Sequence, residues 1–208
     1  MWYPILITVL VGYLLGNLNG AVCMSQLLAH EDVRSRGSGN AGLTNFIRNY
    51  GAGKSVAVIA IDGGKAALAC LAGGLILSGY GLALEGMAIG GLAVMLGHDF
   101  PALLGFKGGK GIMSGCLVAF TIDWRIGVLI LSVFLVMYLL TGYVSLGSVL
   151  ASAAFGAGFV IFHHDNLTVM ICGVVMGALA VFMHRSNISR LIKGQERKTN
   201  LFGKGKKA

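Results

Sequence analysis

Long apolar stretches alternate with short polar segments along the whole chain. Seven of these stretches predict membrane-spanning helices, at residues 3–28, 55–77, 81–97, 111–121, 126–140, 148–162 and 167–183. A helix needs about 20 apolar residues to cross the hydrocarbon layer of a bilayer. The fourth stretch is too short to cross alone by this measure, so six spans are the alternative to seven.

The composition supports a membrane protein. The chain has 208 residues, of which 56% are hydrophobic and only 12% charged, and its mean hydropathy is +0.80. Soluble domains of this size carry about twice that share of charged residues. Because backbone polar groups within lipid must be paired inside each segment, we expect an all-α integral membrane protein, folded as a single polytopic domain over residues 1–208.

The basic residues are concentrated on one side of the predicted spans. Fourteen of the 16 Lys and Arg residues lie before the second span, before the fourth span or after the seventh. Short loops rich in Lys and Arg stay in the cytoplasm. We therefore expect the N-terminus outside and a basic cytoplasmic tail at residues 184–208. Polar segments gathered on one side favour an enzyme that works at the cytoplasmic face over a pore.

The first of two glycine-rich polar loops, residues 37–48, has the composition of a phosphate site. Its three glycines allow turns in which successive backbone N–H groups point at one anion. Thr44 and Arg48 are four residues apart, so a short helix would place both on one face. Arg48 can hold a phosphate through two parallel hydrogen bonds. The alternative is an ordinary turn-rich loop.

The second glycine-rich loop, residues 106–111, combines Lys107 and Lys110 with three glycines directly before an apolar helix. The free N–H groups and the dipole of that helix would add to the two ammonium groups. The alternative is topological, because two lysines also hold a loop on the cytoplasmic side.

Four further groups of residues carry weaker signals. Ser145 and Ser148 could offer hydroxyls at the membrane face, although Ser and Gly also punctuate helix ends. His184 and Asn187 are three residues apart and could share a helical face, or belong to a basic flank. Asp62 and Lys65 fall inside the second predicted span, where we expect a structural pair with each other or with a loop rather than a catalytic role. The four cysteines are isolated in apolar runs, so we expect no metal site.

Taken together, the motifs resemble the bacterial acyl-phosphate-dependent glycerol-3-phosphate acyltransferase family. The matching residues are Asp32-x-Arg34-x-x-Gly37-Ser38-Gly39-Asn40-x-Gly42-x-Thr44-Asn45-x-x-Arg48, His98-x-Phe100-Pro101 running into Phe106-Lys107-Gly108-Gly109-Lys110-Gly111, Tyr143-Val144-Ser145-Leu146, and His184-Arg185-x-Asn187-Ile188-x-Arg190-Leu191. The chain departs from the family pattern in two places: Leu43 replaces a small residue, and the tripeptide Ile112-Met113-Ser114 replaces Val-Ala-Thr.

The resemblance implies seven membrane helices in the bacterial cell (inner) membrane and transfer of a fatty acyl group from acyl phosphate to the 1-hydroxyl of glycerol 3-phosphate. It implies no metal and no cofactor. The expected partners are these two substrates and the lipid bilayer, with no nucleic acid and no obligate protein partner.

The resemblance also assigns roles to individual residues. Ser38, Lys110 and His184 are the expected catalytic residues, with Lys110 neutralising the departing phosphate. The expected substrate-binding residues are Gly39, Asn40, Thr44, Asn45, Arg48, Lys107, Gly108, Gly109, Ser145, Ser148 and Asn187. His184 could be the general base if its pKa lies near neutral, and a phosphate oxygen of a bound substrate could take the proton instead. A covalent acyl-Ser38 ranks last, because no base is adjacent in the sequence.

Two other classes of function are weighed against the enzyme. A small phosphate or anion transporter usually has internal repeats and polar groups near the middle of the bilayer, and we find no fixed repeat. A structural partner of other membrane proteins would leave both glycine-rich loops unexplained.

Overall fold

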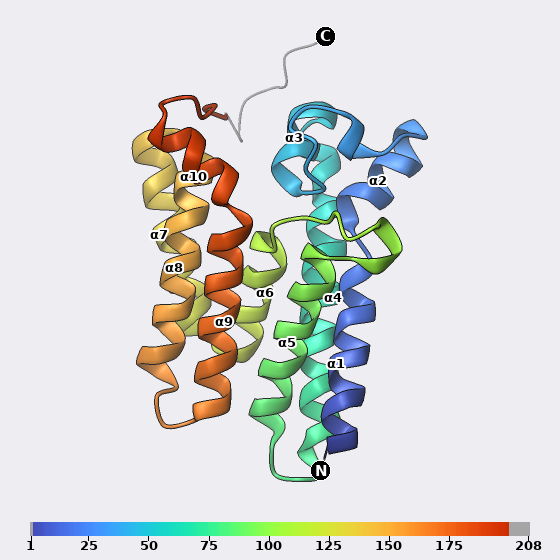
Figure 1. Ribbon diagram of the computed structural model, residues 1–208, viewed down its shortest axis with the longest axis vertical. Coiled ribbons are helices and arrows are strands. Elements are labelled where there is room, and N and C mark those ends of the chain that lie inside the picture. Colours follow the sequence, from blue (N-terminus) through green and yellow to red (C-terminus); the bar gives the residue numbers. More distant parts are fainter. Residues whose placement is uncertain (1, 200–208) are drawn as a thin grey trace.

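The computed structural model describes residues 2–199, and the regular secondary structure of these residues is entirely helical (Figure 1). In chain order the elements are α1 (Trp2–Asn17), α2 (Gly20–Ala29), η1 (Val33–Ser35), α3 (Leu43–Tyr50), α4 (Ala52–Ser78), α5 (Ala83–Asp99), η2 (Ala102–Leu104), α6 (Ile112–Ile122), α7 (Trp124–Thr141), α8 (Val144–Phe162), α9 (Leu167–Met183) and α10 (Arg185–Ile192). The part of the predicted basic tail at residues 200–208, with Lys204, Lys206 and Lys207, lies outside the described residues.

Five of the described segments are long and apolar enough to cross a bilayer: α1 with α2, α4, α5 with η2, α7 and α8. The pair α9 and α10 adds a sixth if it counts as one span, although it is bent by 54°. Helix α6 has only 11 residues, in agreement with the short fourth stretch of the sequence. The all-helical architecture is confirmed, and the number of seven spans stays a prediction.

The helices form two groups, which meet through α6 and through a direct contact of α5 with α9 (Figure 1). In the first group α1 and α4 pack against α5, and in the second α8 packs between α7 and α9. Helix α6 contacts both α4 and α7. Small residues allow the closest approaches: a Cβ atom added to Gly73 of α4 would overlap the backbone of Gly86 in α5. Such contacts are typical of helices packed within lipid.

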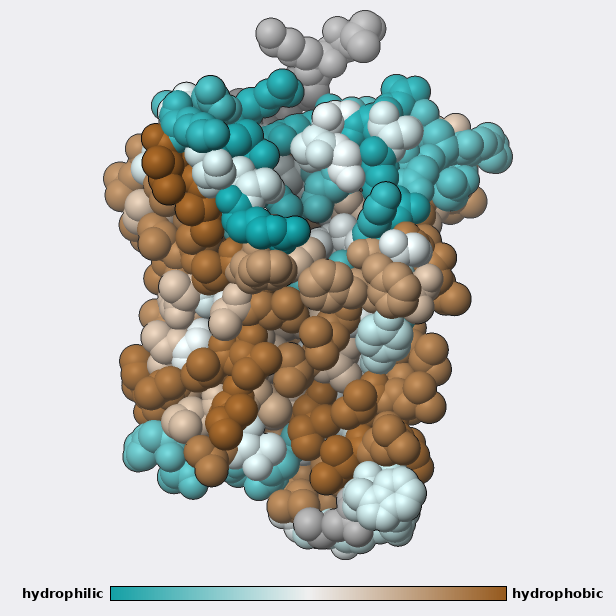
Figure 2. All heavy atoms as spheres, in the orientation of Figure 1, coloured by the Kyte–Doolittle hydropathy of each residue, from teal (hydrophilic) through white to brown (hydrophobic). Residues whose placement is uncertain are grey.

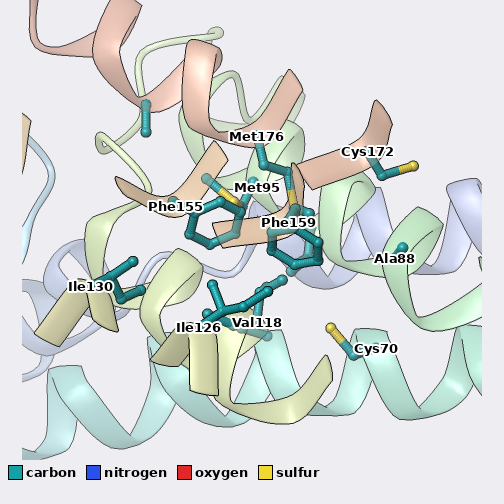
Figure 3. Packing of buried hydrophobic residues seen from close by; sticks show 14 of the residues in the cluster. Cys70, Ala88, Met95, Val118, Ile126, Ile130, Phe155, Phe159, Cys172 and Met176 are labelled. Carbon is teal, nitrogen blue, oxygen red and sulfur yellow. The ribbon is translucent and has the colours of Figure 1, made fainter. Parts of the chain in front are cut away.

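Large apolar side chains fill the space between the two groups (Figure 3). Met95 of α5, Val118 of α6 and Phe159 of α8 are all at most 1% exposed. Phe155 packs against Phe159 with ring centroids 5.1 Å apart. Because lipid tails are as apolar as these side chains, tight van der Waals packing is what holds this core together.

Hydrophobic residues cover the middle and much of the remaining surface of the bundle, and hydrophilic residues gather at the end that carries α3 and α10 (Figure 2). Leu75, Leu139 and Leu140 are more than 70% exposed. An exposed apolar band of this kind fits a lipid-facing surface.

The first predicted span is interrupted near Asn19, where the sequence predicted one continuous helix over residues 3–28. The Asn19 side chain accepts a hydrogen bond from the N–H of Val22 and so begins α2. Asp62 accepts from the N–H of Gly20 at 3.0 Å, and Lys65 donates to the carbonyls of Gly16 and Leu18. The ion pair of Asp62 and Lys65, 2.9 Å apart, confirms the predicted structural pair and supplies partners for the freed backbone groups.

Candidate active site

One cavity of about 620 Å³ collects residues from distant parts of the chain. Both glycine-rich loops contribute to it, together with residues of every α-helix from α3 to α10. The predicted site residues that line it are Ser38, Gly39, Asn40, Thr44, Asn45, Arg48, Lys110, Ser145, Ser148, His184 and Asn187. Lys107, Gly108 and Gly109 are the predicted site residues that do not line it.

Asn45 holds the first glycine-rich loop in shape. Its side-chain carbonyl accepts from the N–H of Ser38 at 2.9 Å. Its amide nitrogen lies 3.0 to 3.1 Å from the carbonyls of Val33, Arg36 and Asn40. The residue is 2% exposed. Asn45 was expected to bind substrate, but its hydrogen-bonding groups are already occupied by the loop.

Two backbone N–H groups of this loop are also in use. Ser38 donates to Asn45, and the N–H of Gly39 donates to the carbonyl of Arg36 at 3.0 Å. The expected cradle of successive N–H groups is therefore wrong for these two residues. Groups that remain for a ligand include the hydroxyls of Ser38 and Thr44, the guanidinium of Arg48 and the start of α3, which no described side chain caps.

The second glycine-rich loop is fixed by its backbone. The N–H of Gly108 donates to the carbonyl of Asp99 at 3.2 Å, and that of Gly109 to the carbonyl of His98 at 3.0 Å. A Cβ atom on Gly109 would overlap the imidazole of His98. The N–H groups of Gly108 and Gly109 are bonded to the end of α5 and are not free for a ligand, so the expected substrate binding by these glycines stays a prediction. The side chain of Lys107 is exposed and outside the cavity.

Lys110 reaches into the cavity and contacts Asn187 through its Nζ atom. Burial, together with the nearby cation Arg190, lowers the pKa of Lys110 to about 8, so its ammonium form dominates at pH 7. Gly111 follows with φ 68°, and no described side chain caps the start of α6. The free N–H groups of the first turn of α6 therefore lie next to Lys110, as the sequence predicted.

His184 and Asn187 meet Lys110 at the junction of α9 and α10. The Nδ1 atom of His184 lies 2.8 Å from the carbonyl of Ala180, so Nδ1 carries the proton and Nε2 is the acceptor. Burial lowers the pKa of His184 to about 4, and the ring is neutral at pH 7. The sequence made His184 a candidate general base only if its pKa lay near neutral. With a pKa of about 4 it is a weak general base.

Residues of the described tail complete the polar wall. The Nδ2 atom of Asn187 donates to Glu196 at 3.1 Å, which turns its Oδ1 atom toward Lys110. Arg190 donates to the same carboxylate at 2.6 Å. Arg190 and Glu196 both line the cavity, and neither was among the predicted site residues. A signal was present in the sequence, because Glu196 is the sole acidic residue in the basic tail at residues 184–208.

Thr199 connects the first loop to the second group of helices. Its hydroxyl accepts from the Nε atom of Arg48 at 3.1 Å. Its backbone carbonyl accepts from the hydroxyl of Tyr138 at 3.0 Å. Arg48 is thus held by a neutral hydroxyl, a partner that a phosphate could replace with stronger charge-assisted bonds.

Ser145 gives an independent indication of a ligand. Its hydroxyl is buried, lines the cavity and has no hydrogen-bond partner within residues 2–199. An unpaired buried hydroxyl is costly, and a polar group of a ligand in the cavity would pair with it. The neighbouring Ser148 is 4% exposed and lines the same wall.

The cavity wall is apolar where it borders the core of the bundle. Met95, Ile130, Phe134 and Phe155 line it and belong to that core or pack against it. Anionic head groups fit the polar end, with its Lys and Arg side chains, and a hydrocarbon chain fits the apolar end.

Comparisons with known proteins place this geometry in a family. A family model described as glycerol-3-phosphate acyltransferase matches residues 6–194. The glycerol-3-phosphate acyltransferase of Thermoanaerobacter sp. (strain X514) is 36% identical over 192 residues, which is 92% of this chain and 94% of the relative. That of Finegoldia magna is also 36% identical, over 91% of this chain and 93% of the relative.

Two solved structures are similar throughout. The crystal structure of PlsY (YgiH), an integral membrane glycerol 3-phosphate acyltransferase in its glycerol 3-phosphate form, has a TM-score of 0.85 and 32% identity. It covers 96% of this chain and 99% of the solved chain. The lysophosphatidic acid form has a TM-score of 0.81 and 32% identity, over 95% of this chain and 96% of the solved one.

Proposed function

The chain belongs to the glycerol-3-phosphate acyltransferase family, and we propose that it transfers a fatty acyl group from acyl phosphate to the 1-hydroxyl of glycerol 3-phosphate. The products are 1-acylglycerol 3-phosphate, that is lysophosphatidate, and inorganic phosphate. Membership in this family favours an acyltransferase over the alternative of an anion transporter. The protein is a multi-pass membrane protein, as its apolar helices and its integral membrane relative PlsY indicate.

The proposed topology has seven spans in one polytopic domain of the bacterial cell membrane. It counts α1 with α2 as one span and lets α6 cross as a short helix. The N-terminus then lies outside, and the basic C-terminal tail lies in the cytoplasm. The concentration of hydrophilic residues at the end with α3 and α10 supports this orientation.

The amphiphilic cavity is the observation that carries the proposal. Lys110 and Arg48 lie at its polar end, where both substrates would place their phosphates. The apolar end suits the fatty chain, which only the acyl donor carries. Glycerol 3-phosphate would bind near Arg48, His184 and Asn187, and the unpaired hydroxyl of Ser145 offers it one more hydrogen bond.

The proposed reaction needs positioning and charge stabilisation more than a strong base. The 1-hydroxyl oxygen of glycerol 3-phosphate attacks the acyl carbonyl carbon, and the bond from that carbon to the phosphate oxygen breaks. Phosphate leaves with the electron pair, and Lys110 stabilises the charge that develops on it. Ser38 and the first turn of α6 lie close enough to the same cavity to assist.

The proton of the 1-hydroxyl goes to a phosphate oxygen in this proposal. His184 is neutral and buried, so its Nε2 atom accepts a hydrogen bond from the hydroxyl and orients it. Since phosphate is itself basic near pH 7, the departing phosphate can carry the proton away. The proposed reaction uses no metal and no cofactor.

Purified protein in detergent or lipid tests this proposal. With acyl phosphate and glycerol 3-phosphate it should release lysophosphatidate and phosphate in equal amounts. Acyl-CoA and acyl-carrier protein serve as the comparison donors. If either works as well as acyl phosphate, the proposed donor is wrong.

A further inference from the structure

The two glycine-rich loops face one cavity although they lie on different parts of the chain. The first follows α2 and the second follows α5. Their relative position decides where Lys110 stands with respect to Ser38 and Arg48. Within residues 2–199, two hydrogen bonds join residues 31–50 directly to residues 100–111, and both come from Arg34.

Arg34 lies in η1, just before the first loop, and it reaches the chain around the second loop through one nitrogen of its guanidinium. The Nη1 atom donates to the carbonyl of Leu104 at 2.9 Å and to that of Lys107 at 2.8 Å. The other side of the group faces Asp32, with Nε 2.9 Å and Nη2 2.6 Å from Oδ2. The Oδ1 atom of Asp32 also accepts from the N–H of Arg34 at 2.8 Å. The guanidinium is therefore fixed on the first side and reaches across to the second.

The bridge ends close to the reactive groups on both sides. On the first side, the carbonyl of Val33, next to Arg34, is bonded to Asn45, which also binds Ser38. On the second side, Lys107 is followed by the two glycines that are bonded to α5, and then by Lys110. Short, hydrogen-bonded stretches of chain therefore connect Arg34 to the residues of each loop that line the cavity.

We propose that Arg34 is a positioning residue that sets the distance between the two glycine-rich loops, and with it the alignment of Lys110 against the groups that hold the substrates. This inference rests on the proposed function of the cavity. Arg34 itself does not line the cavity, and Asp32 already neutralises its charge. It is therefore not a phosphate ligand.

The bridge requires the shape of arginine. Its planar fork presents donors in fixed directions to a carboxylate on one side and to two carbonyls on the other. A lysine in its place has the same charge but one nitrogen, which cannot serve both sides. A misplacement of about 1 Å between the reacting groups lowers a reaction rate about 10²-fold. Binding of each substrate depends on the ligands of its phosphate, and these remain in place without Arg34. Loss of Arg34 should therefore lower kcat more than it raises either KM.

Arg34→Gln and Arg34→Lys test the proposal, with Arg36→Gln as the matched control. Arg36 is an arginine of the same segment, it is also paired with an acidic residue, Glu31 at 2.8 Å, and it is exposed. For each variant, kcat and both KM values are measured, together with the amount and thermal stability of the folded protein. We expect both Arg34 variants to lose about tenfold to 10²-fold in kcat, with both KM values within about threefold of the parent protein. Arg36→Gln should match the parent.

Each other outcome overturns the proposal. An unchanged kcat in Arg34→Gln shows that the loops are aligned without the bridge. Full activity in Arg34→Lys shows that the charge matters and the fork does not. A rise in KM alone makes Arg34 a substrate ligand, and failure of both variants to fold makes it a folding residue.

The proposed function fails separately, since it fails when the parent protein does not turn over acyl phosphate and glycerol 3-phosphate. Turnover by the parent with a normal Arg34→Gln variant removes the positioning role and leaves the function in place.

Discussion

The two glycine-rich loops line the same cavity but are held in place in opposite ways. The first loop is held by a side chain, the buried amide of Asn45, which binds four backbone groups around it. The second is held by backbone bonds to the end of α5, and glycine is required where His98 packs against Gly109. The first loop should therefore fail when a side chain is removed, and the second when one is added.

The loops also differ in what they offer a substrate. The first contributes several polar side chains to the cavity, among them Ser38, Asn40, Thr44 and Arg48. The second contributes the side chain of Lys110 and the uncapped start of α6. The first loop therefore offers a ligand several different side chains, whereas the second offers one lysine and the start of a helix.

Lys110→Ala should give the largest effect. It removes the one ammonium that the second loop places in the cavity, so kcat should fall about 10²- to 10³-fold while the protein stays folded. Lys107→Ala, which changes an exposed side chain of the same loop, should lose far less. Equal, small losses in both variants would favour a purely topological role for the two lysines.

Gly109→Ala should come next. The added methyl group overlaps His98, so the loop must shift and carry Lys110 with it. We expect a loss of about 10²-fold in turnover and a cost of about 1–3 kcal/mol in stability. Gly53→Ala, a helical glycine with open space around it, is the control. Normal turnover by Gly109→Ala would mean that this loop is not held by close packing.

Asn45→Ala tests the first loop. It removes the partner of the N–H of Ser38 and of the carbonyl of Asn40, at a cost of about 3 kcal/mol in the free energy of unfolding. The carbonyls of Val33 and Arg36 lose one donor and keep a backbone one. Asn49→Ala, one helical turn later, removes an exposed side chain that donates to Asn45, and it should cost less than about 1 kcal/mol. Denaturation monitored by circular dichroism in detergent compares the two. A cost no greater than that of Asn49→Ala would remove the hub role of Asn45.

The pH dependence of turnover should show the smallest effect. Burial lowers the pKa of Lys110 to about 8, so the ammonium form predominates below pH 8 and is lost as the pH rises through it. Activity should therefore hold near pH 7 and fall about twofold at pH 8. Lys110→Arg should keep whatever activity it has to higher pH, because arginine stays charged. A profile that is flat to pH 9 would mean that Lys110 retains its usual pKa.

The sequence predicted much of this arrangement because its signals are local. Apolar stretches mark the helices, and the short fourth stretch appears as α6 with 11 residues. The spacing from Thr44 to Arg48 predicted one helical face, and both residues lie on α3 and line the cavity. The charge pattern and the family resemblance together predicted that both loops lie near Ser145 and Asn187, and residues of all of them line one cavity.

What the sequence did not predict depends on contacts between distant segments. The break at Asn19 needs partners from α4, because Asp62 and Lys65 satisfy the freed backbone groups. The N–H groups of the glycines were expected to face a phosphate, but those of Gly39, Gly108 and Gly109 are bonded to carbonyls earlier in the chain. Glu196 was hidden among basic residues whose spacing indicated only a cytoplasmic flank.

The simultaneous binding of two phosphates is the central claim, and a binding experiment tests it without turnover. Radiolabelled glycerol 3-phosphate is titrated into the purified protein with and without a saturating acyl phosphonate, which cannot transfer its acyl group. The account predicts that glycerol 3-phosphate still binds when the acyl phosphonate is present, because the two ligands occupy neighbouring parts of one cavity. Competitive displacement of glycerol 3-phosphate by the acyl phosphonate would contradict it.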